Sequence, residues 1–215
     1  MMMPLLMAKS DALISGNPRL SLQYVTKIEV GGAYSHHFYK FLDFLELHCL
    51  VITDIDSVAV LVGEKTTYPA SLVKNGSHTS NAGIKNWFAK DSQGHYPLAD
   101  CLAASAEHKV SGSRRIAFQI PEQGTMAIGR SFEEALILAN REHFGILGVT
   151  EDQVEDQVEE KAPDNKKKTE FALKYALQVR DWNAPKYIVE GLQWLASSPI
   201  LAVQDAVEVI NETIE

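Results

Sequence analysis

The sequence predicts an α/β fold, a mostly parallel sheet flanked by helices, with an inserted segment and a C-terminal helical extension. The run CLVIT (residues 49–53) is continuously apolar and of strand length, as in strands that are covered on both faces. A strand and a helix are predicted before it, and together the three span roughly the 30 residues of a βαβ unit. Residues 60–114 are polar and irregular, and helical patterns fill the chain beyond residue 148.

The first predicted strand covers residues 22–30 and ends at a pair of glycines. A helix is predicted next, because apolar side chains recur there at the spacing of one helical face. They are Tyr34, Phe38, Phe41, Leu42 and Leu45. If the run 49–53 completes a βαβ unit, Asp54 lies at the carboxyl end of a parallel strand, where open α/β sheets bind ligands.

Residues 60–114 are predicted to be an insertion, since a structureless loop of that length is uncommon. Within it, TSNAGIKNWF (residues 79–88) predicts a short helix capped by Ser80 or Asn81. The insertion therefore separates the strand that ends at the acidic pair from the next apolar run along the chain.

Beyond the insertion, RIAFQI (residues 115–120) predicts a further strand. SFEEALILAN (residues 131–140) predicts a helix, and its residues Ser131 and Glu134 have the spacing of a capping box. If Glu134 serves the cap, its neighbour Glu133 is freer to face a ligand.

The domain prediction divides the chain into residues 1–148, an α/β domain, and residues 149–215, a helical C-terminal region. The second region begins with an acidic stretch that predicts a solvated helix and a turn. Three further helices are predicted, over residues 170–180, 185–196 and 199–214. This region packs either on the sheet or as a small separate unit.

Composition and charge exclude several classes of protein. The chain carries 20 lysines and arginines against 28 acids, a net charge of −8, which argues against simple electrostatic binding of nucleic acid. It does not exclude an enzyme that meets phosphates through bound cations. The sequence contains no GxxxxGK[ST] phosphate loop and no GxGxxG, so a nucleotide-driven motor is expected to lie outside this chain.

The cysteines and the first residues of the chain bear on where the protein is found and on how much of it this chain represents. The two cysteines, Cys49 and Cys101, have no metal-ligand spacing and fit buried thiols in a reducing cytosol, so a cytoplasmic protein is predicted. No apolar run approaches the roughly 18 residues that would cross a membrane. The opening MMMPLLM is typical of the end of a helix, so we expect a fragment of a longer protein.

Two acidic residues, Asp54 and Asp56, directly follow the apolar run. Residues i and i+2 of a strand point to the same side, so their carboxylates could converge just beyond the strand end. Such a pair repels unless one group is protonated or a cation lies between them. Oxygen ligands of high negative charge suit Mg²⁺ or Mn²⁺. The competing interpretation is that one aspartate caps the next segment and the other is solvated.

Three classes of enzyme combine an apolar strand with a D-x-D pattern. Haloacid-dehalogenase-type phosphatases use the first aspartate as nucleophile and need paired aspartates after a later strand, which this sequence lacks. Nucleotide-sugar transferases hold a metal–diphosphate with the pair, but the rest of their fold is not evident. Toprim domains of topoisomerases, primases and some nucleases add an upstream glutamate and bind one or two metals near a phosphodiester.

Five segments distinguish among these classes. They are EVGGAYSHHFYKFLDFLEL, LVITDIDSV, TSNAGIKNWF, RIAFQIPEQG with GRSFEEALILAN, and KKTEFALKYAL. In this order, from about residue 29 to residue 194, they resemble the overcoming-lysogenization-defect (OLD) family of nucleases, more narrowly its C-terminal Toprim region. The resemblance implies a Toprim-like sheet over residues 1–148. It also implies an N-terminal ABC-type ATPase in the parent protein, through which alone ATP would act.

The resemblance implies a metal site. Asp54 and Asp56 match the Toprim D-x-D and would ligate metal, and Ser57 would add an oxygen or order a ligating water. Glu133 matches the acidic residue that the family places after its fourth strand. Two ions, Mg²⁺ or Mn²⁺, are implied. The structural alternative for Glu133 is a polar helix start.

The resemblance also implies a catalytic lysine. Lys168 matches a lysine near the scissile phosphate, where it would stabilise negative charge or protonate a leaving group. Lys166 and Lys167 are rival assignments, and a solvated basic turn is the structural alternative. Contacts to DNA are expected from local basic groups, such as Arg114-Arg115 and these lysines.

One departure from the family pattern concerns the first Toprim strand, which ends in a glutamate. That strand and its glutamate appear in no part of this sequence, and Glu29 lies in what would be the second strand. We therefore expect Glu29 to be a neighbour of the site rather than the missing ligand. The departure puts the affinity of this chain for its metals in doubt.

The predicted function is a metal-dependent DNA endonuclease module, coupled in its parent protein to the ATPase. DNA is the expected substrate, a homodimer is left open, and no membrane partner is expected. Two alternatives stay open. One is a haloacid-dehalogenase-type phosphatase with Asp54 as nucleophile, and the other is a non-catalytic assembly remnant.

Overall fold

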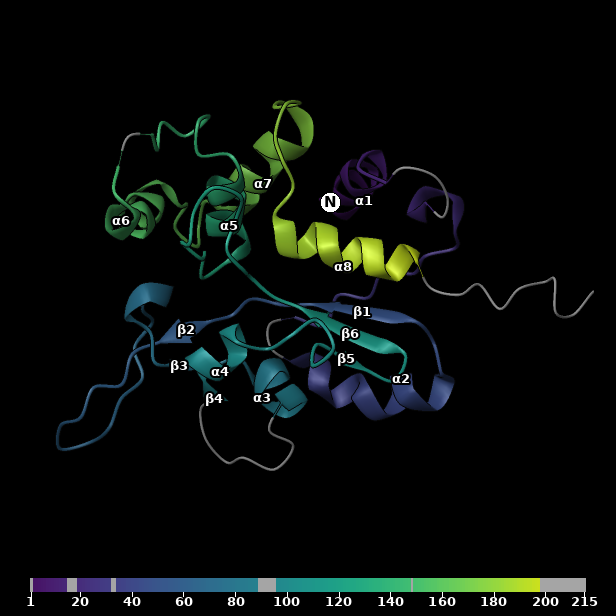
Figure 1. Cartoon of the computed structure of the whole chain (residues 1–215), viewed down its shortest axis with the longest axis horizontal. Helices are drawn as coiled ribbons and strands as arrows, with labels where there is room; N and C mark the ends of the chain where they lie inside the picture. The colour runs from purple at the N-terminus through teal and green to yellow at the C-terminus, as the bar shows by residue number, and fades with distance from the viewer. Residues whose placement is uncertain (1, 15–18, 32–33, 89–95, 148, 198–215) are drawn as a thin grey trace, which may run out of the picture.

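The computed structural model describes residues 2–14, 19–31, 34–88, 96–147 and 149–197. The described residues form helices packed on both faces of a small sheet, with a second small sheet beside it (Figure 1). The predicted α/β class is therefore confirmed. The first sheet has the order β1–β6–β5, with bounds Cys49–Ile52, Arg114–Ala117 and Val110–Ser111.

The pairing of the strands is mixed. Strands β1 and β6 are parallel, with Cys49 opposite Arg114 and Ile52 opposite Ala117, whereas β5 and β6 form an antiparallel hairpin. The second sheet is antiparallel throughout, in the order β2–β3–β4. Its bounds are Ser57–Val58, His78–Thr79 and Tyr96–Pro97. The prediction of a mostly parallel sheet is therefore wrong for the described residues. Between β5 and β6 the connection is too short for anything but antiparallel pairing.

Both faces of the β1–β6 pair are buried, as the apolar run predicts. Helix α8 (Lys186–Ala196) covers one face, with α1 (Met3–Ala12) packed on α8, and α2 (Tyr39–Leu45) and α3 (Ala82–Phe88) lie on the other face (Figure 1). Alternate strand residues divide between the two cores. Leu50, Ile52 and Ala117 pack with α1 and α8, whereas Val51, Ile116 and Phe118 pack with Tyr39, Ile84 and Trp87.

The strand predicted over residues 22–30 is absent from the structure. A 3₁₀ turn, η1 (Leu20–Leu22), is followed by an extended stretch that pairs with no described strand. Tyr24 and Ile28 are 97% and 68% exposed there. An apolar extended segment becomes a strand only when a neighbour takes its backbone hydrogen bonds, and β1 pairs with β6 instead. The first half of the predicted βαβ unit is therefore wrong.

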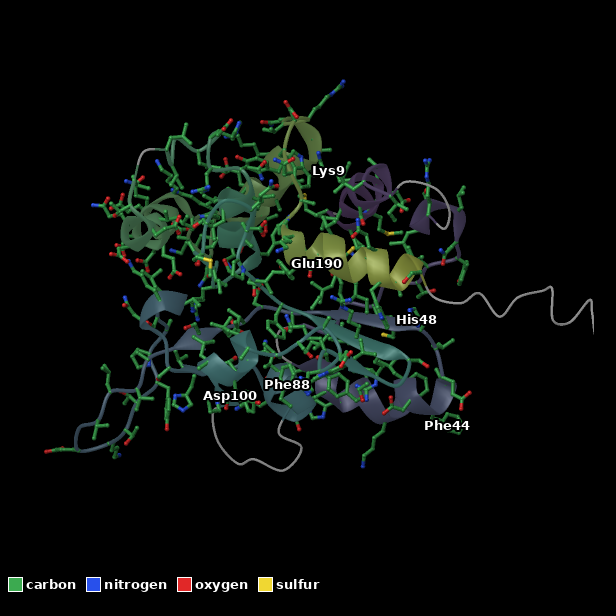
Figure 2. The ribbon with its side chains drawn as sticks, viewed as in Figure 1. Lys9, Phe44, His48, Phe88, Asp100 and Glu190 are labelled. Atoms are coloured by element: carbon green, nitrogen blue, oxygen red, sulfur yellow. The ribbon has the colours of Figure 1, made fainter. Side chains whose placement is uncertain are left out.

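The helix predicted over residues 34–45 exists but buries a different face. It begins as a 3₁₀ helix, η2 (Tyr34–Phe38), and continues as α2. Tyr39 is its buried anchor, and the Arg114 guanidinium lies 4.5 Å from the centre of the Tyr39 ring. The predicted inward residues Phe38 and Phe41 are exposed, and Figure 2 shows Phe44 at the outer end of α2. The tighter 3₁₀ start changes the angular phase, which a uniform 3.6-residue period does not anticipate.

The predictions for residues 79–140 hold more closely. Helix α3 begins after Asn81, whose Oδ1 accepts a hydrogen bond from the Ile84 N–H, so Asn81 is the cap. The predicted strand 115–120 becomes β6. Helix α5 (Phe132–Ala139) is capped by Ser131, whose hydroxyl accepts from the Glu134 N–H. The inserted segment also contains η3 (Val73–Asn75) and α4 (Leu98–Leu102).

The C-terminal region contains α6 (Glu151–Lys161), α7 (Lys168–Leu177) and α8. Helix α6 is less solvated than predicted, because Val154 and Val158 are buried. Helix α8 packs on the sheet, and the predicted helix 199–214 lies outside the described residues. The division at residue 148 stays a prediction. None of the described helices combines the length and apolar character that a membrane crossing requires.

Packing of α8 on the sheet depends on a small residue at position 191. A Cβ on Gly191 would lie 3.0 Å from Leu50 Cδ1 and 3.2 Å from Ala117 Cβ. We therefore expect Gly191→Leu to lower the free energy of unfolding by about 1–3 kcal/mol through overpacking. The matched control is Gly63→Leu, whose Cβ would meet only a Lys65 carbonyl at 3.8 Å. Urea denaturation measures both, and equal losses in the two variants would contradict this packing argument.

Candidate functional site

The D-x-D pair occupies the turn that carries the chain from the first sheet to the second. The Thr53 N–H still donates to the Ala117 carbonyl, 3.0 Å away, and β2 begins at Ser57. Asp56 has a φ of +47°, a left-handed conformation that is uncommon for residues other than glycine. The alternation of a strand therefore stops before Asp56, and the turn geometry determines where its carboxylate points.

Asn81 holds this turn from the N-terminus of α3. Its Nδ2 lies 2.9 Å from Thr53 Oγ1, 2.8 Å from the Asp54 carbonyl and 3.1 Å from Asp56 Oδ2. The side chain is 1% exposed, so these contacts compensate the cost of burying a carboxamide. Asn81 thus both caps a helix and orders the acidic turn, whereas the sequence predicted only the cap.

Gln119 holds the same turn from the other side. It follows β6, is fully buried, and donates from Nε2 to Asp54 Oδ1 at 2.6 Å. Its Oε1 accepts from the Ile55 N–H at 2.7 Å, and its Nε2 also lies 3.4 Å from the Tyr187 hydroxyl. Sequence analysis did not single out Gln119 or Tyr187. The available signal was a polar residue within the apolar run RIAFQI.

The pKa of Asp54 responds to the charges of the other acidic site residues and of Lys168, so these groups lie near one another. Burial raises the pKa of the Asp54 carboxyl to about 6, and the hydrogen bond from Gln119 opposes that shift. The charges of Asp56 and Glu133 raise this pKa further, and the charge of Lys168 lowers it. Three segments that are distant in the sequence therefore bring three carboxylates and one ammonium group to the carboxyl end of β1.

Glu133 and Lys168 form an ion pair, with 3.0 Å between Glu133 Oε2 and Lys168 Nζ. Glu133 lies in the first turn of α5 and Lys168 at the start of α7. The adjacent Glu134 accepts a hydrogen bond from the Arg130 N–H at 2.6 Å, so it serves the helix start. Glu133 Oε2 is buried and accepts no hydrogen bond, which leaves the ammonium as its compensation.

Lys168 differs from its two neighbours in the basic run. The backbone N–H groups of Lys166 and Lys167 donate to Asp164 Oδ1, 3.0 Å away in each case, and both side chains are exposed. Only Lys168 is placed by the structure in an ion pair with a carboxylate of the site. Among the three rival lysines, the geometry therefore favours Lys168.

Ser57 and Glu29 lie apart from this cluster. The Ser57 hydroxyl is buried and directed at the Leu72 carbonyl, 3.4 Å away, on the side of the second sheet. The hydroxyl is thus committed away from the carboxylates, and its predicted role as a metal ligand finds no geometric support. The Glu29 carboxylate is paired with the Lys27 ammonium in the exposed stretch before η2.

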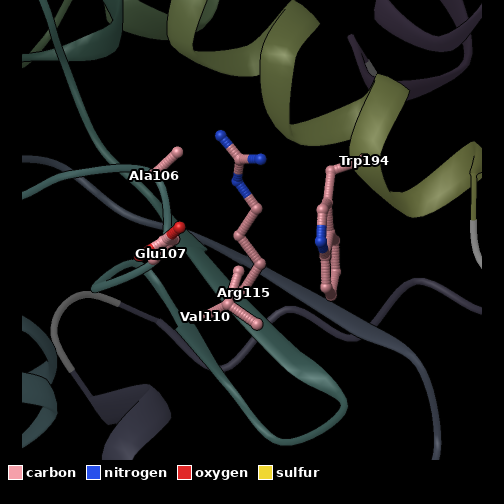
Figure 3. A pocket seen from close by; sticks show the side chains of 5 residues that line it. All are labelled: Ala106, Glu107, Val110, Arg115 and Trp194. Atoms are coloured by element: carbon pink, nitrogen blue, oxygen red, sulfur yellow. The ribbon is translucent and has the colours of Figure 1, made fainter.

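The two arginines predicted to contact DNA have different surroundings. Arg114 is buried, and its guanidinium donates to both carboxylate oxygens of Asp43, so it is committed to the core. Arg115 lines an open pocket of about 410 Å³ together with Val110 and Trp194 (Figure 3). Arg115 also lies 3.9 Å from Glu190 of α8. This pocket lies at the start of β6, whereas the acidic cluster lies beyond the end of β1.

The chemistry of the donors fits a hard divalent cation, because Asp54, Asp56 and Glu133 offer oxygen ligands and a surplus of negative charge. The described residues nevertheless contain no group of three or more His, Cys, Asp or Glu side chains arranged so that it could hold a metal ion. The ion pair between Glu133 and Lys168 is one reason why the carboxylates do not surround a common point. The Lys168 ammonium occupies the position beside the buried oxygen of Glu133. The donor set is therefore suitable in kind but not closed around a cation.

Comparison with known protein families identifies one match. The model described as the overcoming lysogenization defect protein-like TOPRIM domain matches residues 2–56. The comparison with curated proteins found no match, and neither did the comparison with solved structures. The resemblance to the Toprim region of the OLD family is thereby confirmed over a stretch that ends at the D-x-D pair. Glu133 and Lys168 lie outside the matched residues.

The hydrogen bonds of Asn81 predict its contribution to stability. We expect Asn81→Ala to lower the free energy of unfolding by about 1–3 kcal/mol, because it leaves buried polar groups of the turn unpaired. Asn86→Ala is the control, since Asn86 is exposed in the same helix, and its loss should stay within about 0.5 kcal/mol. Chemical denaturation measures the free energy of unfolding of both variants. If Asn81→Ala lowered it no more than Asn86→Ala does, the proposed role of Asn81 in ordering the turn would be contradicted.

The raised pKa of Asp54 predicts a dependence of stability on pH. Because the folded protein disfavours the charged carboxylate, the contribution of Asp54 is fully present below about pH 4 and is lost as the pH rises through about 6. In metal-free buffer, Asp54→Asn should therefore be more stable than the wild type at about pH 7.5, by about 1–3 kcal/mol. Denaturation at both pH values tests this, and an advantage that did not change with pH would contradict it.

Proposed function

We propose that this chain is a metal-dependent DNA endonuclease module of the Toprim type. One observation carries the proposal: Asp54, Asp56, Glu133 and Lys168 come from three distant segments and lie close enough for their charges to act on one carboxyl group. The family match over residues 2–56 supports a nuclease-type, metal-binding function, since it contains the D-x-D pair. DNA as the substrate is part of the proposal.

The metal ligands in this proposal are Asp54, Asp56 and Glu133. Bound Mg²⁺ or Mn²⁺ would supply an activated water and would stabilise the leaving oxygen of a phosphodiester. Asp54 must lose its proton to serve as a ligand, and with a pKa of about 6 it is mostly ionised at neutral pH. Asn81 holds the Asp56 carboxylate and Gln119 holds the Asp54 carboxylate through hydrogen bonds.

Lys168 supplies the positive charge of the proposed site, whereas the three acidic residues would bind the metal. In the described arrangement its ammonium neutralises Glu133 across 3.0 Å. If Glu133 held a cation, that ammonium would be available to a phosphate oxygen. A positive group fixed there stabilises the negative charge that develops in the transition state. It can also protonate the leaving alkoxide.

The overall charge of −8 shapes how DNA would be bound. Because the chain is acidic, attraction to DNA must come from bound cations and from local basic groups. Lys166 and Lys167 are exposed beside Lys168 and are suited to contact the backbone of DNA. Coupling to an ABC-type ATPase domain in the parent protein and formation of a homodimer belong to this proposal as well.

Nicking of supercoiled plasmid in Mn²⁺ or Mg²⁺ tests the proposal. We expect cutting by the wild type, no detectable cutting by Asp54→Asn, Asp56→Asn or Glu133→Gln, and a loss of about 100-fold or more for Lys168→Met. Glu64→Gln and Lys65→Met alter exposed residues of the inserted segment and are the matched controls. Metal-dependent cutting that persisted in Asp54→Asn and Asp56→Asn would refute the proposed site.

A further inference from the structure

Gln119 is a fully buried polar side chain that touches the acidic turn. It is 0% exposed and lies just beyond the end of β6. Burying a carboxamide costs free energy unless both its donor and its acceptor are paired. An apolar residue of similar size would fill the same space without that cost. The presence of an amide therefore calls for an account of what its hydrogen bonds do.

The two short hydrogen bonds of Gln119 reach consecutive residues of one turn. Nε2 donates to Asp54 Oδ1 at 2.6 Å, and Oε1 accepts from the Ile55 N–H at 2.7 Å. Because the carboxamide is planar, its donor and acceptor are fixed relative to each other. The Asp54 carboxylate and the Ile55 peptide are therefore held in one relative orientation, which neither a methionine nor a leucine could impose.

The Ile55 N–H determines which way the carboxamide faces, and Tyr187 lies on the side of the amide nitrogen. The Tyr187 hydroxyl lies 3.4 Å from the same Nε2, and its ring is buried at the start of α8. The Ile55 N–H is a donor only, so it must face the oxygen of the amide. The nitrogen consequently faces Asp54 and Tyr187, and the amide cannot flip without opposing one donor with another.

We infer that Gln119 is a positioning residue of the proposed metal site, one that aims the Asp54 carboxylate by tying it to the Ile55 backbone. The inference rests on the proposed function for its consequence in metal binding. Removing a partner that orients a ligating carboxylate typically weakens metal binding by about 10–100-fold. Asp54 keeps its second oxygen, Oδ2, for a cation, while Gln119 holds Oδ1.

The experiment compares Gln119→Met with Gln123→Met, because Gln123 is exposed four residues further along the same segment. Two quantities are measured on the full chain. One is hydrogen exchange of the Ile55 amide in metal-free buffer, by NMR. The other is the Mn²⁺ concentration that gives half-saturation, by electron paramagnetic resonance, with Asp54→Asn defining the site-specific part of the binding.

In Gln119→Met we expect faster exchange of the Ile55 amide and an Mn²⁺ half-saturation concentration raised by about 10–100-fold. Gln123→Met should match the wild type in both. Unchanged exchange at Ile55, or an unchanged Mn²⁺ affinity despite faster exchange, would overturn the inference. If Gln119→Met does not fold, Gln119→Asn replaces it, since its amide is one methylene too short to reach both partners.

The two proposals fail in different ways. If the wild type shows no Mn²⁺ binding that depends on Asp54, the proposed function is overturned, and the role of Gln119 in metal binding with it. If the wild type binds Mn²⁺ at Asp54 and Gln119→Met binds it equally well, only the positioning role is overturned.

Discussion

Burial of a polar turn between two sheets is the constraint on which the rest of the site depends. The chain leaves β1, passes Asp54 and Asp56, and enters the second sheet at β2. Buried polar groups of such a turn must be hydrogen-bonded, or the fold loses free energy for each one. Asn81 and Gln119 supply these bonds from opposite sides. The start of α3 and the end of β6 are thus tied to the same few atoms.

Helices α5 and α7 contribute the other two charged groups of the site, Glu133 and Lys168. Because Glu134 serves the start of α5, the neighbouring Glu133 is not needed there and is directed at Lys168 of α7. The ion pair compensates the charge of a carboxylate whose Oε2 atom is buried. The folded protein can therefore carry a surplus of carboxylates at one sheet edge, provided that a basic group from another helix accompanies them.

Helix caps could be predicted from the sequence, whereas strand pairing and contacts between distant segments could not. The caps Asn81 and Ser131 were predictable because a cap depends on residues within one helical turn. The strand over residues 22–30 was not, because periodicity shows where apolar residues recur but not whether a partner strand is present. Gln119 contacts Asp54 across 65 residues of sequence and Tyr187 across 68, and no spacing rule connects these residues.

The charge of the site explains why an acidic chain is compatible with an anionic substrate. Asp54, Asp56 and Glu133 together carry three negative charges when ionised, and Lys168 offsets one, which leaves a surplus of two. One divalent cation would balance that surplus, and a second would make the site positive toward a phosphodiester. Burial is the largest cause of the raised pKa of Asp54, and the charges of Asp56 and Glu133 raise it further. In the proposed function, such cations would offset the surplus of carboxylates and would attract the DNA that the net charge repels.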